Sequence, residues 1–146
     1  HDLSLRFIEV MRTNDNSAFF ERHHTPGAAI AAKLEAMGWL PMLRPSGAGP
    51  AIDYAQPNAP GRIGIIAPYG KDFCATCNRL RVSAKGKFHL CLFGEHGIDL
   101  RPLLQADSQL DALVARIAKL TGTKPFAHHL RDGISGGTPH LASIGG

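Results

Sequence analysis

The cysteines constrain this chain more than any other residue type, because all three lie within one short stretch. Two residues separate Cys74 from Cys77, and thirteen residues separate Cys77 from Cys91. This spacing is typical of metal ligands, because it places two thiols on one tight turn and brings a third to them from a returning hairpin. A closed zinc site takes four protein ligands, whereas three thiolates on an iron–sulfur cluster leave one iron open. The spacing predicts a metal site with one open position.

Three interpretations of the cysteines remain open from the spacing alone. Zinc would need a fourth ligand, which His89 or His96 is placed to supply, and His89 would share a strand face with Cys91. A Cys-x2-Cys pair also serves in thiol redox chemistry, and lone cysteines are common in protein cores. The paired spacing makes the core interpretation the weakest of these.

Basic residues surround the cysteine segment. Arg79 and Arg81 follow Cys77 at alternate positions, so an extended backbone places both on one face. Two guanidinium groups beside an open metal position suit a phosphate or carboxylate, although a solvated strand edge would look the same. The net charge of +4 also suits an anionic partner. Further positive charge comes from Lys71, Lys85 and Lys87.

The apolar pattern predicts an α+β chain with a small antiparallel sheet, hairpin connections and flanking helices. The predicted strands cover residues 3–11, 39–44, 51–55, 62–68, 80–83 and 88–93, and the last of these carries Cys91. The predicted helices cover residues 18–24, 26–37, 99–104 and 108–120. Thr25 and Ser108 are the expected N-caps, and Gly38 is the expected C-cap.

Length and composition limit the number of domains and the cellular setting of the chain. A chain of 146 residues with 44% hydrophobic residues suffices for one domain with its own core. No apolar run is long enough for a membrane span, and the odd number of cysteines favours a reducing, cytoplasmic setting. The chain opens on His1 and enters a strand with no partner nearby in sequence, so we expect a fragment of a longer chain.

Several motifs resemble the C-terminal region of the GTP 3′,8-cyclase family, and they occur in the same order as in that family. The members of this family are radical S-adenosylmethionine enzymes. The central motif is the run from Phe73 to Arg81, Phe-Cys-Ala-Thr-Cys-Asn-Arg-Leu-Arg. The other matching stretches are residues 6–11, 64–68, 86–87, 91–93, 99–101 and 144–146. The resemblance covers nearly the whole chain.

The resemblance implies the C-terminal part of an enzyme that converts GTP to 3′,8-cyclo-7,8-dihydro-GTP in molybdenum cofactor biosynthesis. Residues 1–40 would form the last strand and helix of an incomplete (β/α) barrel. Residues 41–146 would form a C-terminal domain that binds a second [4Fe–4S] cluster and GTP. Cys74, Cys77 and Cys91 would hold that cluster, and its open iron would meet the guanine base.

The same resemblance assigns roles to further residues. Arg79 and Arg81 would contact GTP, while Arg6 and Met11 would lie by the S-adenosylmethionine site. The tail Gly145-Gly146 would enter the active site. A cyclic pyranopterin monophosphate synthase would act downstream. Neither a membrane nor a nucleic acid would be a partner, and the protein could form a homodimer.

The chain departs from the family in one respect: it lacks the Cys-x3-Cys-x2-Cys loop that holds the first cluster and cleaves S-adenosylmethionine. We therefore expect this chain alone to be inactive. Two alternatives stay open. One is a stand-alone zinc- or cluster-binding module that binds a nucleotide without catalysis. The other is a scaffold piece that associates with a separately encoded barrel half.

Overall fold

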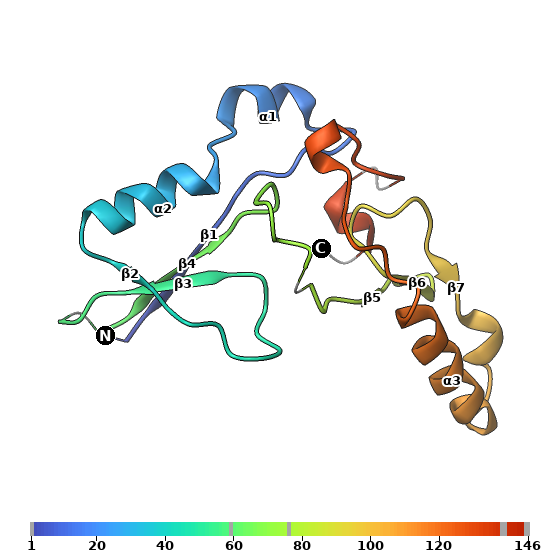
Figure 1. The fold of residues 1–146 in the computed structure, drawn as a ribbon. Coiled ribbons are helices and arrows are strands. Elements are labelled where there is room, and N and C mark those ends of the chain that lie inside the picture. Colours follow the sequence, from blue (N-terminus) through green and yellow to red (C-terminus); the bar gives the residue numbers. More distant parts are fainter. Residues whose placement is uncertain (1, 59, 76, 138–139, 145–146) are drawn as a thin grey trace. The chain divides into compact units, whose positions relative to one another are not determined.

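The chain folds into two compact units, each built around its own sheet (Figure 1). The first unit contains residues 1–11 and 18–78, and the second contains residues 12–17 and 79–146. Helices and sheets occur together, which confirms the α+β class. The computed structural model describes residues 2–58, 60–75, 77–137 and 140–144.

The sheet of the first unit is mixed. Its strands, in order across the sheet, are β1 (Ser4–Ile8), β4 (Arg62–Ile66), β3 (Ile52–Ala55) and β2 (Leu40–Pro41). β1 runs parallel to β4, whereas β3 is antiparallel to both β4 and β2. The antiparallel sheet predicted for the strands between residues 39 and 68 is confirmed, and β1 adds a parallel strand that no hairpin joins to β4.

Two helices follow β1, namely α1 (Ser17–His23) and α2 (Gly27–Ala36). Leu34 of α2 packs with Tyr54 and Ile65 of the sheet, and these three buried side chains form the centre of the core. Partly buried side chains complete that core: Ile30, Ala31, Trp39, Ile63 and Ala67. α2 thus covers one face of the sheet.

The ends of α2 test two of the predicted caps. Gly38 follows the helix with a φ of +82°, a left-handed conformation that glycine adopts without strain, so the predicted C-cap signal is confirmed. The predicted N-cap is wrong, because Pro26 occupies the N-cap position and no side chain caps the helix. Thr25 lies one residue too early to act as the cap.

The second unit holds a three-stranded antiparallel sheet. Its strands, in order, are β5 (Arg81–Val82), β6 (Lys87–His89) and β7 (Ile98–Asp99). The turn between β5 and β6 includes Gly86, whose N–H donates to the carbonyl of Ser83 at 2.9 Å. The hairpin predicted over this segment is confirmed.

Helix α3 (Leu110–Thr121) packs onto this sheet. Leu100, Phe88 and Leu120 are the buried centre, with Leu113 and Ile117 of α3 packed against them. The predicted cap at Ser108 is wrong: it lies within a 3-10 turn, and the side chain of Gln109 accepts the nearby backbone N–H groups. The 3-10 helices of this unit are Arg101–Leu103, Asp107–Gln109, Leu130–Asp132 and Leu141–Ile144.

None of the helices in the described ranges combines the length and the apolar composition that a bilayer crossing requires. The predicted barrel and C-terminal domain at residues 1–40 and 41–146 stay a prediction.

Candidate functional site

The Cys-x2-Cys pair lies on a series of tight turns that leaves the end of β4. The N–H of Gly70 donates to Ala67, that of Phe73 to Gly70, and that of Cys77 to Cys74, the last at 3.1 Å. Among the described residues neither cysteine forms a disulfide, and both are half-buried. One short turn therefore carries both cysteines, and their role as metal ligands stays a prediction.

Cys91 does not lie on a strand, which corrects the prediction for residues 88–93. β6 ends at His89, and Cys91 begins a turn in which its carbonyl accepts the N–H of Gly94 at 3.4 Å. The buried ring of Phe93 anchors this turn, so the apolar residues mark a packed loop and not a longer strand. Cys91 is half-buried and forms no disulfide with a described residue.

The cysteines are divided between the units: Cys74 and Cys77 belong to the first, and Cys91 belongs to the second. Within the described ranges, no group of three or more His, Cys, Asp or Glu side chains is arranged to hold a metal ion. The donor chemistry fits an iron–sulfur cluster, since all three side chains are thiols outside any disulfide of the described residues and two share one turn. The complete ligand set stays a prediction.

The two histidines considered as zinc ligands differ in their surroundings. His96 is exposed, whereas His89 is half-buried, and its Nε2 is buried without a hydrogen-bond partner among the described residues. Burial lowers the pKa of His89, and the nearby cations Lys87 and Arg81 lower it further. A neutral imidazole retains the nitrogen lone pair that a metal needs, so His89 remains the better zinc ligand.

Arg79 and Arg81 both belong to the second unit, as does Cys91. Arg79 is half-buried, and its carbonyl accepts a 2.7 Å hydrogen bond from the ammonium group of Lys124. Arg81 begins β5, where it pairs with His89 of β6. The backbone of this basic segment is therefore held in place on both sides of Leu80.

Arg6 lies in the middle of β1, and its guanidinium Nη2 is 3.5 Å from the carboxylate Oδ2 of Asp53. Met11 follows the end of β1 and is half-buried. The tail residues Gly145 and Gly146 lie outside the described residues. Just before them, the side chain of Ile144 is buried.

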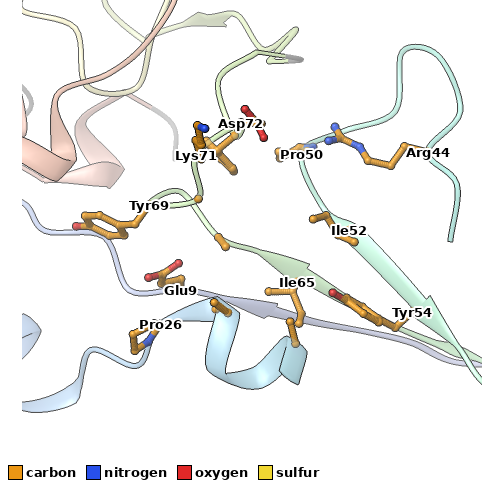
Figure 2. A pocket seen from close by; sticks show the side chains of 16 residues that line it. Glu9, Pro26, Arg44, Pro50, Ile52, Tyr54, Ile65, Tyr69, Lys71 and Asp72 are labelled. Atoms are coloured by element: carbon orange, nitrogen blue, oxygen red, sulfur yellow. The ribbon is translucent and has the colours of Figure 1, made fainter. Parts of the chain in front are cut away.

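A pocket of about 410 Å³ lies within the first unit, at the ends of β1 and β4 and beside the start of α2. Figure 2 shows Glu9 and Pro26 at one end, whereas Arg44, Lys71 and Asp72 lie at the opposite rim. Apolar side chains line the floor between these ends: Ile52, Tyr54 and Ile65. Phe73 lines the pocket one residue before Cys74, so the pocket borders the Cys-x2-Cys turn.

The sequence analysis missed a buried pair at this pocket. Glu9 is 6% exposed, and its Oε1 is 2.8 Å from Nε2 of His24. The His24 ring also stacks on Phe20, with ring centroids 4.4 Å apart, and meets the edge of Tyr69. The adjacent histidines 23 and 24 were visible in the sequence, but nothing local connects the second of them to a carboxylate fifteen residues away.

The amino-acid sequence matches a family model and several individual proteins. The family model described as Molybdenum Cofactor Synthesis C matches residues 3–130, and the chain belongs to that family. The chain is 56% identical over 143 residues to the GTP 3′,8-cyclase of Stenotrophomonas maltophilia strain K279a, a match that covers 98% of this chain and 44% of that protein. It is 54% identical over 144 residues to the GTP 3′,8-cyclase of Vibrio vulnificus strain CMCP6, covering 99% of this chain and 43% of that protein.

A third relative is the GTP 3′,8-cyclase of Vibrio cholerae strain ATCC 39541, which is 55% identical over 144 residues. That match covers 99% of this chain and 43% of the relative. The chain therefore spans less than half of the length of the relatives that it matches.

Proposed function

We propose that this chain is the C-terminal part of a GTP 3′,8-cyclase and contributes to molybdenum cofactor biosynthesis. The observation that carries the proposal is identity of 54–56% to three cyclases along 98–99% of the chain. Matches of this length extend through both units of the chain. The proposal places the first cluster and the cleavage of S-adenosylmethionine in a barrel segment outside this sequence.

In this proposal Cys74, Cys77 and Cys91 hold the second [4Fe–4S] cluster. When bound, such a cluster supplies an iron with one open coordination position, which can accept a nitrogen or oxygen of the guanine base. The chain contributes three cysteine thiols, and two of them lie on a turn that is already closed by backbone hydrogen bonds. A preformed turn lowers the entropy that ordering these two ligands would cost.

The basic residues bind and orient the nucleotide. Arg79 and Arg81 interact with the anionic part of GTP, since guanidinium groups form paired hydrogen bonds with phosphate oxygens. Arg6 and Met11 lie by S-adenosylmethionine, and the tail Gly145-Gly146 enters the active site. The product passes to a cyclic pyranopterin monophosphate synthase in the cytoplasm.

The test is anaerobic reconstitution of the protein with iron and sulfide, followed by metal analysis and paramagnetic resonance of the reduced protein with and without GTP. We expect four irons and four sulfides bound through these cysteines, and a spectrum that shifts when GTP is added. Cys91→Ser should lower the cluster content and abolish the shift, whereas the matched variant His96→Ala should retain both.

The zinc module is the alternative outcome of the same experiment. Tight zinc, no iron–sulfur cluster and no response to GTP would overturn the proposed function. In that case His89→Ala should release the zinc, because His89 is the better placed of the two histidines.

A further inference from the structure

Arg6, Gly64 and Asp53 lie side by side on three adjacent strands. Strand register pairs Arg6 of β1 with Gly64 of β4, and Gly64 in turn with Asp53 of β3. Residues that are directly opposite in a sheet point to the same face. The ion pair between Arg6 and Asp53 therefore crosses the strand that separates β1 from β3.

Gly64 provides the space for this crossing. A Cβ atom at position 64 would lie 2.6 Å from Oδ1 of Asp53, 3.2 Å from Cγ of Arg6 and 3.6 Å from its Nε. The first distance is shorter than van der Waals contact allows. Both side chains consequently lie over the bare backbone of Gly64, and any side chain there would push them apart.

The stability of the ion pair does not explain its presence. Side-chain exposure is 46% for Arg6 and 25% for Asp53, and partly exposed pairs contribute at most about 1 kcal/mol. Oδ1 of Asp53 is buried and has no hydrogen-bond partner in the described part of the chain, which costs free energy. A buried polar atom left without a partner often indicates a functional constraint.

We propose that Asp53 is a positioning residue that holds the guanidinium of Arg6, so that its remaining N–H groups bind the carboxylate of S-adenosylmethionine. This inference rests on the proposed function. A guanidinium has five N–H donors in a rigid plane, so an anchor at Nη2 fixes the direction of the others. The carboxylate is the only anionic group of S-adenosylmethionine.

The site is separate from the pocket beside α2. Tyr54 and Ile65 line that pocket, and they directly follow Asp53 and Gly64 in the sequence. Because alternate residues of a strand point to opposite faces, Arg6, Gly64 and Asp53 lie on the other face of the sheet. Substitutions in the trio therefore leave the pocket lining in place.

Steady-state kinetics of the full-length protein, with its barrel segment, test the proposal. Asp53→Asn keeps the shape of the side chain and removes its charge, and we expect about a tenfold higher KM for S-adenosylmethionine. The KM for GTP should stay within about twofold, and Asp53→Glu should restore part of the affinity. The matched control Asp99→Asn removes the exposed partner of Arg101 in the second unit and should leave both constants unchanged.

A double-mutant cycle separates positioning from a merely structural role. Arg6→Ala should raise the same KM, and adding Asp53→Asn to it should change nothing further, because Asp53 acts through Arg6. An unchanged KM for S-adenosylmethionine in Asp53→Asn would overturn the inference. An equal additional loss in the Arg6→Ala background would overturn it as well.

A measurement without catalysis keeps this inference distinct from the proposed function. Phenylglyoxal modifies accessible arginines, and peptide mass mapping reports the rate at Arg6. Asp53→Asn and Gly64→Ala should each raise that rate severalfold, because both release the guanidinium. If the unsubstituted full-length enzyme neither cleaves S-adenosylmethionine nor cyclises GTP, the proposed function fails. If the modification rate of Arg6 is unchanged in both variants, the pairing of Arg6 with Asp53 is refuted.

Discussion

The buried pair of Glu9 and His24 makes the sharpest stability prediction. The Glu9 side chain is 3% exposed, and Nε2 of His24 lies 2.8 Å from its Oε1. His24→Phe keeps an aromatic ring against Phe20 and removes the nitrogen, so the carboxylate loses this partner. Leaving a buried polar group without a partner costs about 1–3 kcal/mol, and more for a charged one. We expect a loss of about 2–3 kcal/mol in the free energy of unfolding.

The chain offers a matched control in a second histidine–carboxylate pair. His129 lies 3.2 Å from Asp132, but their side chains are 70% and 65% exposed. Water replaces the lost contact at an exposed site, so His129→Phe should cost less than about 0.5 kcal/mol. The two pairs share their chemistry and differ in burial.

Urea unfolding at pH 7, followed by circular dichroism, measures both variants. The midpoint should fall for His24→Phe at an unchanged slope, because the area exposed on unfolding stays the same. Adding Glu9→Gln should recover part of the loss, since a neutral amide costs less to bury than a carboxylate. Equal losses for His24→Phe and His129→Phe would refute the reasoning that burial makes the first pair important.

Three further predictions concern the second unit. Leu100→Ala removes a side chain that is 2% exposed and should cost about 2–5 kcal/mol of unfolding free energy, whereas Leu110→Ala, at a residue 60% exposed, should cost little. The hydrogen bonds from Arg101 lower the pKa of Asp99 to about 2, so its stabilising contribution is complete above about pH 4 and is lost as the pH falls through about 2. A carboxyl NMR titration should show that midpoint, and Arg101→Gln should raise it towards 3.8. Gly137→Ala should lower the melting temperature of the chain by several degrees, because a Cβ there would overlap the backbone of Glu95; an unchanged melting temperature would contradict that packing.

Local signals in the sequence predicted most of the elements but not how they pair. The helix expected at 26–37 is α2 within one or two residues, and Gly38 ends it as expected. The parallel pairing of β1 with β4 was missed, since no short-range pattern records which distant strand lies alongside. The strand carrying Cys91 was also extended too far, because an alternating apolar pattern cannot distinguish a strand from an anchored turn.

The candidate site shows the same division. The thiols and arginines were visible because their residue types and spacing carry chemistry directly. The pair of Glu9 with His24, and the pair of Arg6 with Asp53, depend on tertiary contacts. Gly64 is the clearest example, because a glycine within a strand indicates only a close approach, and the structure was needed to identify the two side chains that approach it.

The exposure of β1 bears on the prediction that residues 1–40 belong to a barrel. Parallel strands are normally buried on both faces, yet every residue of β1 is exposed, with Leu5 at 54% and Ile8 at 59%. Within the described residues β1 pairs with β4 alone, so one edge of its backbone has no strand partner. The curated relatives extend well beyond the part that this chain matches. A further strand paired with that edge would satisfy the backbone groups of β1 that have no ladder partner, and its side chains would lie beside Arg6.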